Sequence, residues 1–233
     1  MHDSWRQRYV AAGPAKTIRL VVGDEMNIHR VYRLVSTPFR RRRMRAFERR
    51  FALDSSTTIL DVGGTPETWE LAETKPHVTL LNLTLPRRPL PHHVKSIVGD
   101  GTCLPFADKA YDIVFSNSVI EHLHTRERQS LFASEVRRVG RRYYVQTPNR
   151  WFPVEPHYLT PGMHFLPKSW QRKLLRNFSV WGWITRPTRQ DCERSTDEIR
   201  LLSAGEFQSL FPDSSMTKER FVGFTKSLTV ERR

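Results

Sequence analysis

Cysteine is scarce in this sequence: Cys103 and Cys192 are the only two among 233 residues. Two thiols cannot build a disulfide framework or a four-thiolate zinc site. No apolar run approaches the ~20 residues that a bilayer-spanning helix needs. The polar start of the chain, Met1 to Arg6, lacks the apolar region of a secretory signal. From these absences we expect a cytoplasmic protein without an integral membrane segment.

Several catalytic signatures are also missing. The sequence contains neither a Gly-x-Ser-x-Gly elbow nor a Walker-type Gly-Lys-Ser/Thr loop, which argues against a hydrolase of that type and against an NTPase. From Gly63 it reads Gly-Gly-Thr-Pro-Glu-Thr, not the Gly-x-Gly-x-x-Gly of a nicotinamide dehydrogenase. The histidines at 92–93 and 122–124 do not join cysteines or carboxylates at a recognised zinc spacing, so no metal is expected.

Positive charge is abundant and uneven. The formal net charge is +14, and residues 1–53 contribute 13 basic against 4 acidic side chains. Seven arginines lie within the eleven residues from Arg40 to Arg50. Such a run favours a polyanionic partner, either nucleic acid or an acidic membrane surface at which the protein would be peripheral. A solvated helix face that keeps the protein soluble remains the alternative.

A change in composition near residue 54 divides the chain. The 38% hydrophobic content supports a folded core. Apolar spacing predicts helices at 25–35 and 39–51, interrupted at Ser36-Thr37-Pro38 because proline disfavours helix at the preceding residue. We therefore expect residues 1–53 to form a short basic helical N-terminal appendage that acts as a lid. Residues 54–233 would form the main domain.

Strand and helix patterns alternate through the main domain. Short strands are predicted at 57–62, 78–81, 94–98, 111–115 and 143–146, with helices from Thr65 and Thr125 between them. Ser203 and Glu206 form a capping-box pattern, and two strand-like runs flank Gly223. The result is an α/β domain with a mostly parallel seven-stranded sheet, helices on both faces and a C-terminal antiparallel hairpin.

The loop after the first predicted strand is suited to a ligand. Open α/β sheets bind ligands beyond the carboxyl ends of their strands. Gly63 and Gly64 permit a tight turn and close approach of the backbone. A helix starting near Pro66 would direct free N–H groups at an anionic group, while Asp61 would suit an ammonium. An amino-acid moiety satisfies both, although an ordinary strand-to-helix turn remains possible.

Two further segments complete a recognisable set. Residues 99–108 read Gly-Asp-Gly-Thr-Cys-Leu-Pro-Phe-Ala-Asp and are followed by Tyr111-Asp112-Ile113-Val114, and residues 116–123 read Ser-Asn-Ser-Val-Ile-Glu-His-Leu. With the first loop, in this order and spacing, they resemble the class I S-adenosylmethionine-dependent methyltransferases, especially the type 11 methyltransferase group. The resemblance covers residues 57–149, and more loosely the hairpin to residue 230. It implies a Rossmann-like fold with S-adenosyl-L-methionine as cofactor.

The resemblance also implies a role for each position. Asp61, Gly63, Gly64 and Thr65 would hold the methionine end of the cofactor, and Asn82 would hold the ribose. Asp100 would accept from the adenine amino group, with Gly101 and Thr102 near the ring and Leu83 and Leu104 as apolar surface. Ser116 and Asn117 would line the methyl-donor end. Thr65, Glu67 and Asn82 depart from the family pattern, because later glycines and an acidic ribose ligand are usual there.

Two histidines are candidates for the catalytic base. His122 stands beside Glu121 near the start of a predicted helix, and a neutral imidazole suits this role. His157 belongs to an aromatic segment after the fifth strand that would form the acceptor pocket. A structural histidine and simple loop packing remain the alternatives.

We therefore expect a methyltransferase whose acceptor is a small molecule or is lipid-linked, held between the strand-five loop and the N-terminal helices. An RNA methyltransferase that uses the arginine run, and a catalytically inactive cofactor-binding scaffold, remain alternatives. An affinity that falls steeply with salt would indicate the RNA methyltransferase. Cofactor binding without turnover would indicate the inactive scaffold.

Overall fold

The computed structural model describes residues 28–233, with side chains described from Arg40 onward. Seven strands form one sheet in the order β3-β2-β1-β4-β5-β9-β8. Its strands are β1 (Thr58–Val62), β2 (His77–Asn82), β3 (Val94–Val98), β4 (Tyr111–Asn117), β5 (Gly140–Pro148), β8 (Ser215–Phe221) and β9 (Phe224–Arg232). Strands β1 to β5 pair in parallel, while β9 pairs antiparallel with both β5 and β8. The predicted sheet and its terminal hairpin are confirmed.

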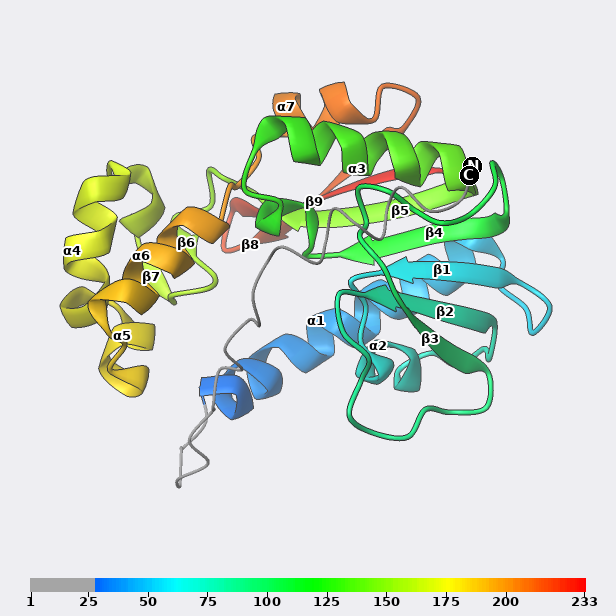
Figure 1. Ribbon diagram of the computed structural model, residues 1–233, viewed down its shortest axis with the longest axis horizontal. Coiled ribbons are helices and arrows are strands. Elements are labelled where there is room, and N and C mark those ends of the chain that lie inside the picture. Colours follow the sequence, from blue (N-terminus) through cyan, green and yellow to red (C-terminus); the bar gives the residue numbers. More distant parts are fainter. Residues whose placement is uncertain (1–27) are drawn as a thin grey trace, which may run out of the picture.

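Helices cover both faces of the sheet, as Figure 1 shows. On one face lie α3 (Arg126–Val139) and α7 (Ala204–Leu210), where Phe132 and Phe207 pack with Leu60. On the other lie α1 (Ile28–Phe51) and α2 (Pro66–Glu70), where Phe47 and Trp69 pack against the neighbouring strand residues. Because side chains alternate along a strand, β1 contributes to both cores. The Ser203–Glu206 capping box is present at α7.

The helix α1 differs from its prediction. It is continuous from Ile28 to Phe51 and passes through Pro38, where the sequence predicted an interruption. Residues 25–27 of the predicted first helix lie outside the described residues. A proline within a helix removes one hydrogen bond and crowds one carbonyl, and the packed end of α1 offsets this local cost. Met44, Phe47 and Phe51 are buried against β1, β4 and β5.

The C-terminal half of α1, which the sequence assigned to the N-terminal appendage, packs on the sheet. Phe47 lies 4.9 Å from Phe115 and 5.1 Å from Tyr144, ring centroid to ring centroid. Arg43, Arg45 and Arg50 form ion pairs with Glu219, Glu73 and Glu231. From residue 40 to 51, α1 is thus one layer of the domain. Residues 1–53 were expected to act as a lid, and the side chains of most of them are not among those described. The lid role and the domain boundary at residue 54 therefore stay predictions.

An insertion between β5 and α7 was not predicted. It contains β6 (Val154–Glu155), β7 (Thr160–Pro161), the 3₁₀ helix η3 (Met163–Phe165), α4 (Lys168–Phe178), α5 (Val180–Thr185) and α6 (Arg189–Glu198). Its own small core is formed by Tyr158, Met163, Leu175 and Cys192. In Figure 1 it projects from the side of the sheet toward which the arrowheads of β1 and β4 point. The insertion therefore stands at the edge where a ligand is expected.

None of the described helices combines the length and the apolar character that crossing a bilayer requires.

Candidate active site

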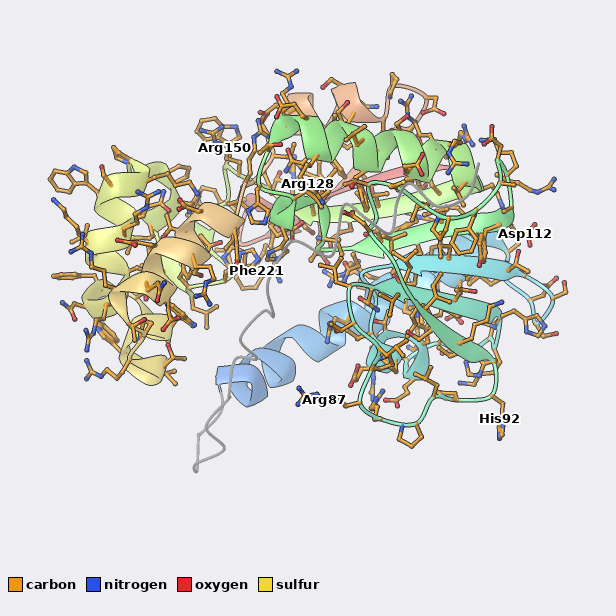
Figure 2. All side chains as sticks on the ribbon, viewed as in Figure 1. Arg87, His92, Asp112, Arg128, Arg150 and Phe221 are labelled. Carbon is orange, nitrogen blue, oxygen red and sulfur yellow. The ribbon has the colours of Figure 1, made fainter. Side chains whose placement is uncertain are left out.

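A cavity of about 790 Å³ opens at the carboxyl ends of β1 to β4. Its wall takes residues from the loop after each of these strands, including Gly63 and Gly64, Asn82 and Leu83, Gly99 to Gly101, and Ser118, Val119 and His122. Arg87 and Arg128 also line it and lie on opposite sides of this edge of the sheet (Figure 2). This edge is where open α/β sheets hold ligands, and the volume is typical of a cofactor pocket.

The glycine loop after β1 is shaped for close approach. Gly63 has a φ of 75°, and its N–H donates to Leu81 O at 2.8 Å. A Cβ at Gly63 would lie 2.5 Å from a methyl of Val119, so no larger residue fits without rearrangement. Thr65 is the N-cap residue of α2, but its side chain makes no capping hydrogen bond. With Pro66 it faces the cavity, as the sequence analysis expected.

The structure corrects the expected role of Asp61. Its side chain is completely buried and does not line the cavity. Asp61 Oδ2 accepts a hydrogen bond from Trp69 Nε1 at 2.7 Å, and a Cβ at Gly64 would lie 1.8 Å from that oxygen. Asp61 thus supports the glycine loop from beneath and does not face the cavity. The sequence could not show this, because it does not reveal that Trp69 folds back onto β1.

Asn82 is placed between the glycine loop and the cavity. Its Nδ2 donates to Gly64 O at 3.0 Å, so the residue ties the loops after β1 and β2 together. Its Oδ1 accepts from no described residue and is available to a ligand hydroxyl. Leu83 follows, with 75% of its side chain exposed at the cavity rim. Both residues are brought to the cavity, as expected.

Asp100 lines the cavity within a dense set of hydrogen bonds. Its Oδ1 accepts from the backbone N–H and the hydroxyl of Thr102, both at 2.8 Å, and its Oδ2 accepts from Arg128 at 2.9 Å. Burial acts to raise the pKa of Asp100, but the bonds from Thr102 and Arg128 outweigh it and lower that pKa. The carboxylate is ionised at neutral pH and rigidly aimed. Arg128, on α3, was not predicted from the sequence.

Three residues around Asp100 take different positions. Gly101 lines the cavity, and a Cβ there would lie 2.8 Å from Val62. Thr102 does not line it, since its polar groups are committed to Asp100. Leu104 is buried in the core beneath the site. Of these three, the backbone at Gly101 is the part placed to meet a ring.

Ser116 and Asn117 are not at the cavity wall. Ser116 is completely buried and its hydroxyl donates to Val62 O at 2.9 Å. Asn117 faces the opposite layer, where it lines a small hollow with Arg40 and Tyr144. The cavity is instead lined by the next residues, Ser118 and Val119. Ser118 has a φ of 59°, so the chain turns sharply here, and a strand that runs two residues beyond its predicted end accounts for the shift.

The two candidate histidines are brought together. The rings of His122 and His157 lie 4.9 Å apart, centroid to centroid, and nearly perpendicular. His157 Nδ1 lies 2.6 Å from Glu155 Oε1, and the other oxygen of Glu155 accepts from the Tyr158 N–H at 2.7 Å. His122 lines the main cavity. Glu155 lines a second cavity of about 330 Å³, bounded by Tyr158, Lys168 and other residues of the insertion.

Glu121 completes this cluster. Its Oε2 accepts from the Thr147 hydroxyl at 2.9 Å, while its Oε1 is buried with no partner among the described residues. Ligand-type atoms of Glu121, His122 and His157 all lie within 4.8 Å of one another. The sequence could not predict that these residues lie close together. His157 belongs to the segment after β5, whereas Glu121 and His122 belong to the segment after β4. Fold topology alone joins them.

The cluster has shifted proton affinities. Burial raises the pKa of Glu121 to about 7. Partial burial, with the neighbouring His157, lowers the pKa of His122 to about 4. Burial acts to lower the pKa of His157, but its bond to Glu155 outweighs this and raises it. At neutral pH, His122 is therefore neutral and able to accept a proton, while His157 holds a proton more tightly than an ordinary histidine.

Known proteins similar to this chain were found by sequence and by structure. Residues 68–142 match the family model Methyltransf_11, described as a methyltransferase domain. The match runs from α2 into β5 and so contains the loops after β2, β3 and β4. Uncharacterized protein Rv1509 of Mycobacterium tuberculosis (strain ATCC 25618 / H37Rv) is 36% identical over 95 residues, which cover 35% of this chain and 32% of that protein. The match thus spans about a third of that relative's length.

Solved structures share the fold. A Burkholderia thailandensis 1,6-didemethyltoxoflavin-N1-methyltransferase with bound 1,6-didemethyltoxoflavin and S-adenosylhomocysteine aligns with a TM-score of 0.53 and 11% identity, covering 87% of this chain and 81% of that one. A putative methyltransferase from an antibiotic biosynthesis pathway of Anabaena variabilis ATCC 29413 aligns with a TM-score of 0.50 and 15% identity, covering 76% and 64%. At these identities the likeness concerns the fold.

The family match over residues 68–142, the strand order and the cavity together support a class I S-adenosylmethionine-dependent methyltransferase domain of the type 11 group. The resemblance seen in the sequence is confirmed. S-adenosylmethionine is the cofactor of this class.

Proposed function

We propose that this protein is an S-adenosylmethionine-dependent methyltransferase acting on a small-molecule or lipid-linked acceptor. The observation that carries the proposal is the single cavity into which the loops after β1, β2, β3 and β4 all converge. S-adenosylmethionine, when bound, supplies an electrophilic methyl group on a sulfonium. The remaining chemistry is positioning of the acceptor and removal of its proton.

The residues at the cavity suit this cofactor. Asp100 holds a fixed carboxylate whose remaining lone pairs can accept from an adenine amino group. Asn82 Oδ1 can accept from a ribose hydroxyl, and the backbone at Gly63 and Gly64 leaves room for the amino-acid end. Thr65 stands where the family usually has a glycine. Its side chain lines the cavity and leaves the cavity open. Asn82 replaces the usual charge with a weaker hydrogen bond.

His122 is the proposed general base. It is neutral at neutral pH, has an exposed edge and lines the cavity close to Ser118 and Val119. A proton taken from the acceptor as its nucleophilic atom attacks the methyl group would reside on His122. The negative charge of Glu155 acts to raise the pKa of His122 and so favours the resulting cation, and His157 lies edge-on against the imidazole. Proton removal of this kind contributes roughly 100-fold to 10,000-fold.

The second cavity is the proposed acceptor site. It lies between the strand-five loop and the insertion, and His124 belongs to the walls of both cavities. This places the acceptor against α4 and α6 instead of the N-terminal helices that the sequence suggested. The Burkholderia thailandensis methyltransferase of similar fold has 1,6-didemethyltoxoflavin and S-adenosylhomocysteine bound, which supports a small acceptor here.

An RNA acceptor is less consistent with the arginine run. Arg43, Arg45 and Arg50 are engaged by carboxylates of the same chain, and Met44 and Phe47 between them are buried. Fewer free cations therefore remain on α1 for phosphates than the sequence suggested. Activity that falls steeply with salt would reverse this preference.

Methyl transfer from radiolabelled S-adenosylmethionine tests the proposal. The full chain is incubated with small-molecule, lipid and RNA fractions of a bacterial extract, and label is followed into each. We expect label in the small-molecule or lipid fraction, and none with Asp100→Ala. Label in RNA alone would contradict the acceptor class. Cofactor binding without label in any fraction would favour the inactive scaffold.

A further inference from the structure

The insertion contains a stretch with no negative charge. From residue 156 to residue 190 there is no Asp or Glu in 35 residues, although the whole chain has 24 in 233. The same stretch holds six Lys and Arg and three of the six tryptophans of the chain. It corresponds to η3, α4 and α5. The small core of the insertion uses four buried side chains, with Leu174, Trp181 and Ile199 packed against them, so the other two tryptophans of the stretch, Trp170 and Trp183, are not part of it.

Large apolar side chains of this stretch face solvent. Trp170, Phe178 and Trp183 are 61%, 62% and 56% exposed, and Ile184 is 44% exposed. On α4 the positions 170, 174 and 178 recur every four residues, so they form one stripe beside the buried positions 171 and 175. The Trp183 indole N–H donates to Asn177 O, which fixes α5 at the end of that stripe. Two helices thus share one exposed aromatic surface.

Cations border this surface. Lys173 and Arg176 follow Trp170 at three-residue steps, so they occupy the adjacent row of α4, and Arg186 follows α5. Within the described part of the chain, no carboxylate pairs with Lys173, Arg176 or Arg186. Arg172 and Arg189, in contrast, pair with Asp197 and Glu193 of α6. The acidic side chains of α6 therefore neutralise Arg172 and Arg189, while Lys173, Arg176 and Arg186 keep their charge beside the aromatic stripe.

A hollow for an anionic group adjoins the patch. About 420 Å³ between α4 and α6 is lined by Arg172, Lys173, Arg176 and Arg189, with Glu193 as the one carboxylate. Indole rings at headgroup depth and flanking Lys and Arg are the features with which amphipathic helices bind acidic bilayers. Each basic side chain near an anionic surface contributes about 1 kcal/mol. The aliphatic Ile184 favours acyl chains over stacked bases.

We propose that α4 and α5 form a docking surface for a membrane rich in anionic lipid headgroups. The aromatic side chains enter the interface and Lys173, Arg176 and Arg186 meet the headgroups. If the proposed function holds, the surface also has a use. The same α4 places Lys168 and Gln171 in the wall of the second cavity, so a lipid-linked acceptor could reach the methyl group without leaving the membrane.

Sedimentation with vesicles tests this proposal. The full chain is mixed with vesicles of phosphatidylcholine alone or with added phosphatidylglycerol. We expect binding to the anionic vesicles only, with a blue shift of tryptophan fluorescence. Trp170→Ala with Trp183→Ala, and separately Lys173→Glu with Arg176→Glu, should each weaken binding by about tenfold or more.

Matched controls separate this surface from others. Trp151→Ala removes a tryptophan that is 60% exposed outside the patch, and Arg41→Glu with Arg42→Glu reverses two exposed arginines of α1; both should bind vesicles as the parent does. Far-UV circular dichroism and urea unfolding of every variant should match those of the parent, which shows that each is folded and keeps this test independent of the proposed function.

Three outcomes would overturn the proposal. The first is absence of binding to anionic vesicles. The second is loss of binding in the α1 controls but not in the patch variants. The third is self-association or RNA binding that the patch variants abolish, in a protein that does not bind vesicles. This result would show that the surface binds a partner of another kind.

Discussion

The indole nitrogen of Trp69 donates to Asp61 Oδ2 at 2.7 Å, in the interior directly beneath the glycine loop. Both side chains are completely buried, and Asp61 Oδ1 has no partner among the described residues. Burial raises the pKa of Asp61 to about 7, against the smaller lowering effect of the Trp69 bond. The carboxyl group beneath the cofactor loop therefore binds a proton more tightly in the folded chain than in the unfolded chain.

This carboxyl group predicts a pH-dependent stability. Its pKa is raised on folding, so its contribution is full below the unfolded value near 4 and is lost as pH rises through about 7. Asp61→Asn keeps an acceptor for Trp69 but cannot ionise. We expect the melting temperature of the variant, relative to the parent, to rise between pH 5 and pH 8. A pH-independent difference would contradict the assignment.

Gly64 should be intolerant of any side chain. A Cβ there would lie 1.8 Å from the Asp61 carboxylate, and this pair cannot move without breaking the Trp69 bond. We expect Gly64→Ala to cost about 1–3 kcal/mol in unfolding free energy and to weaken S-adenosylhomocysteine binding. Gly205→Ala is the control, since nothing lies within 4 Å of its Cβ position. Equal effects of the two substitutions in urea unfolding would refute this reading.

Asp100 should determine cofactor affinity. Asp100→Asn retains an acceptor for Thr102 but loses the charge facing Arg128 and the cavity. Since hydrogen bonds to charged groups contribute about 1.5–3 kcal/mol, we expect S-adenosylhomocysteine binding to weaken by about tenfold to a hundredfold. Asp108→Asn, on the same loop but paired with Arg138 at the surface, should bind normally. Unchanged affinity in Asp100→Asn would remove this residue from the site.

The histidine pair predicts a coupled titration. Burial and the adjacent His157 lower the pKa of His122 to about 4. Replacing this neighbour in His157→Gln should raise that pKa, which can be followed by NMR of the His122 ring without an acceptor. His77→Gln, at an exposed strand end, should leave it unmoved. A His122 pKa near 6.5 in the parent would contradict the geometry.

Activity should follow the same pair once an acceptor is known. We expect His122→Gln to lower kcat by about 100-fold or more while cofactor affinity stays unchanged. His157→Gln should lower kcat less, since it acts through His122. If His122→Gln has the parent's kcat, His122 is a structural residue of η2 (Ile120–His122).

Much of the scaffold was predictable because its elements carry local signals. Each of the five predicted parallel strands coincides with an observed strand, since short β-rich runs end at glycine or polar turns. The capping box of α7 and the turn at Gly223 were equally predictable from the sequence. The uninterrupted α1 was not, because its continuity depends on the packing of Phe47 and Phe51 and overrides the local preference at Pro38.

The site was predictable by loop but not by side-chain direction. The sequence located Gly63, Asn82 and Asp100 at the cavity, yet Asp61 and Ser116 point into the core. For Ser116 the strand runs two residues beyond its predicted end, and for Asp61 the partner Trp69 lies in the following helix. Neither feature can be read from the local sequence pattern. The approach of His157 to His122, and the insertion that carries it, depend on tertiary contacts alone.

The proton chemistry assigned to the cluster also predicts insensitivity to chelation. Glu121, His122 and His157 lie close enough for a cation, but a neutral base in reach of the acceptor makes a Lewis acid unnecessary. Methyl transfer should be unchanged after dialysis against EDTA. Loss of activity that zinc restores, and that Glu121→Gln abolishes, would instead identify a metal centre.

Calorimetric titration with S-adenosylhomocysteine, with NAD as the control ligand, tests the central claim most directly. We predict micromolar binding of S-adenosylhomocysteine, about −8 kcal/mol, with no binding of NAD. Binding of NAD alone, or of neither ligand, by the folded protein would contradict the assignment of the cavity to S-adenosylmethionine.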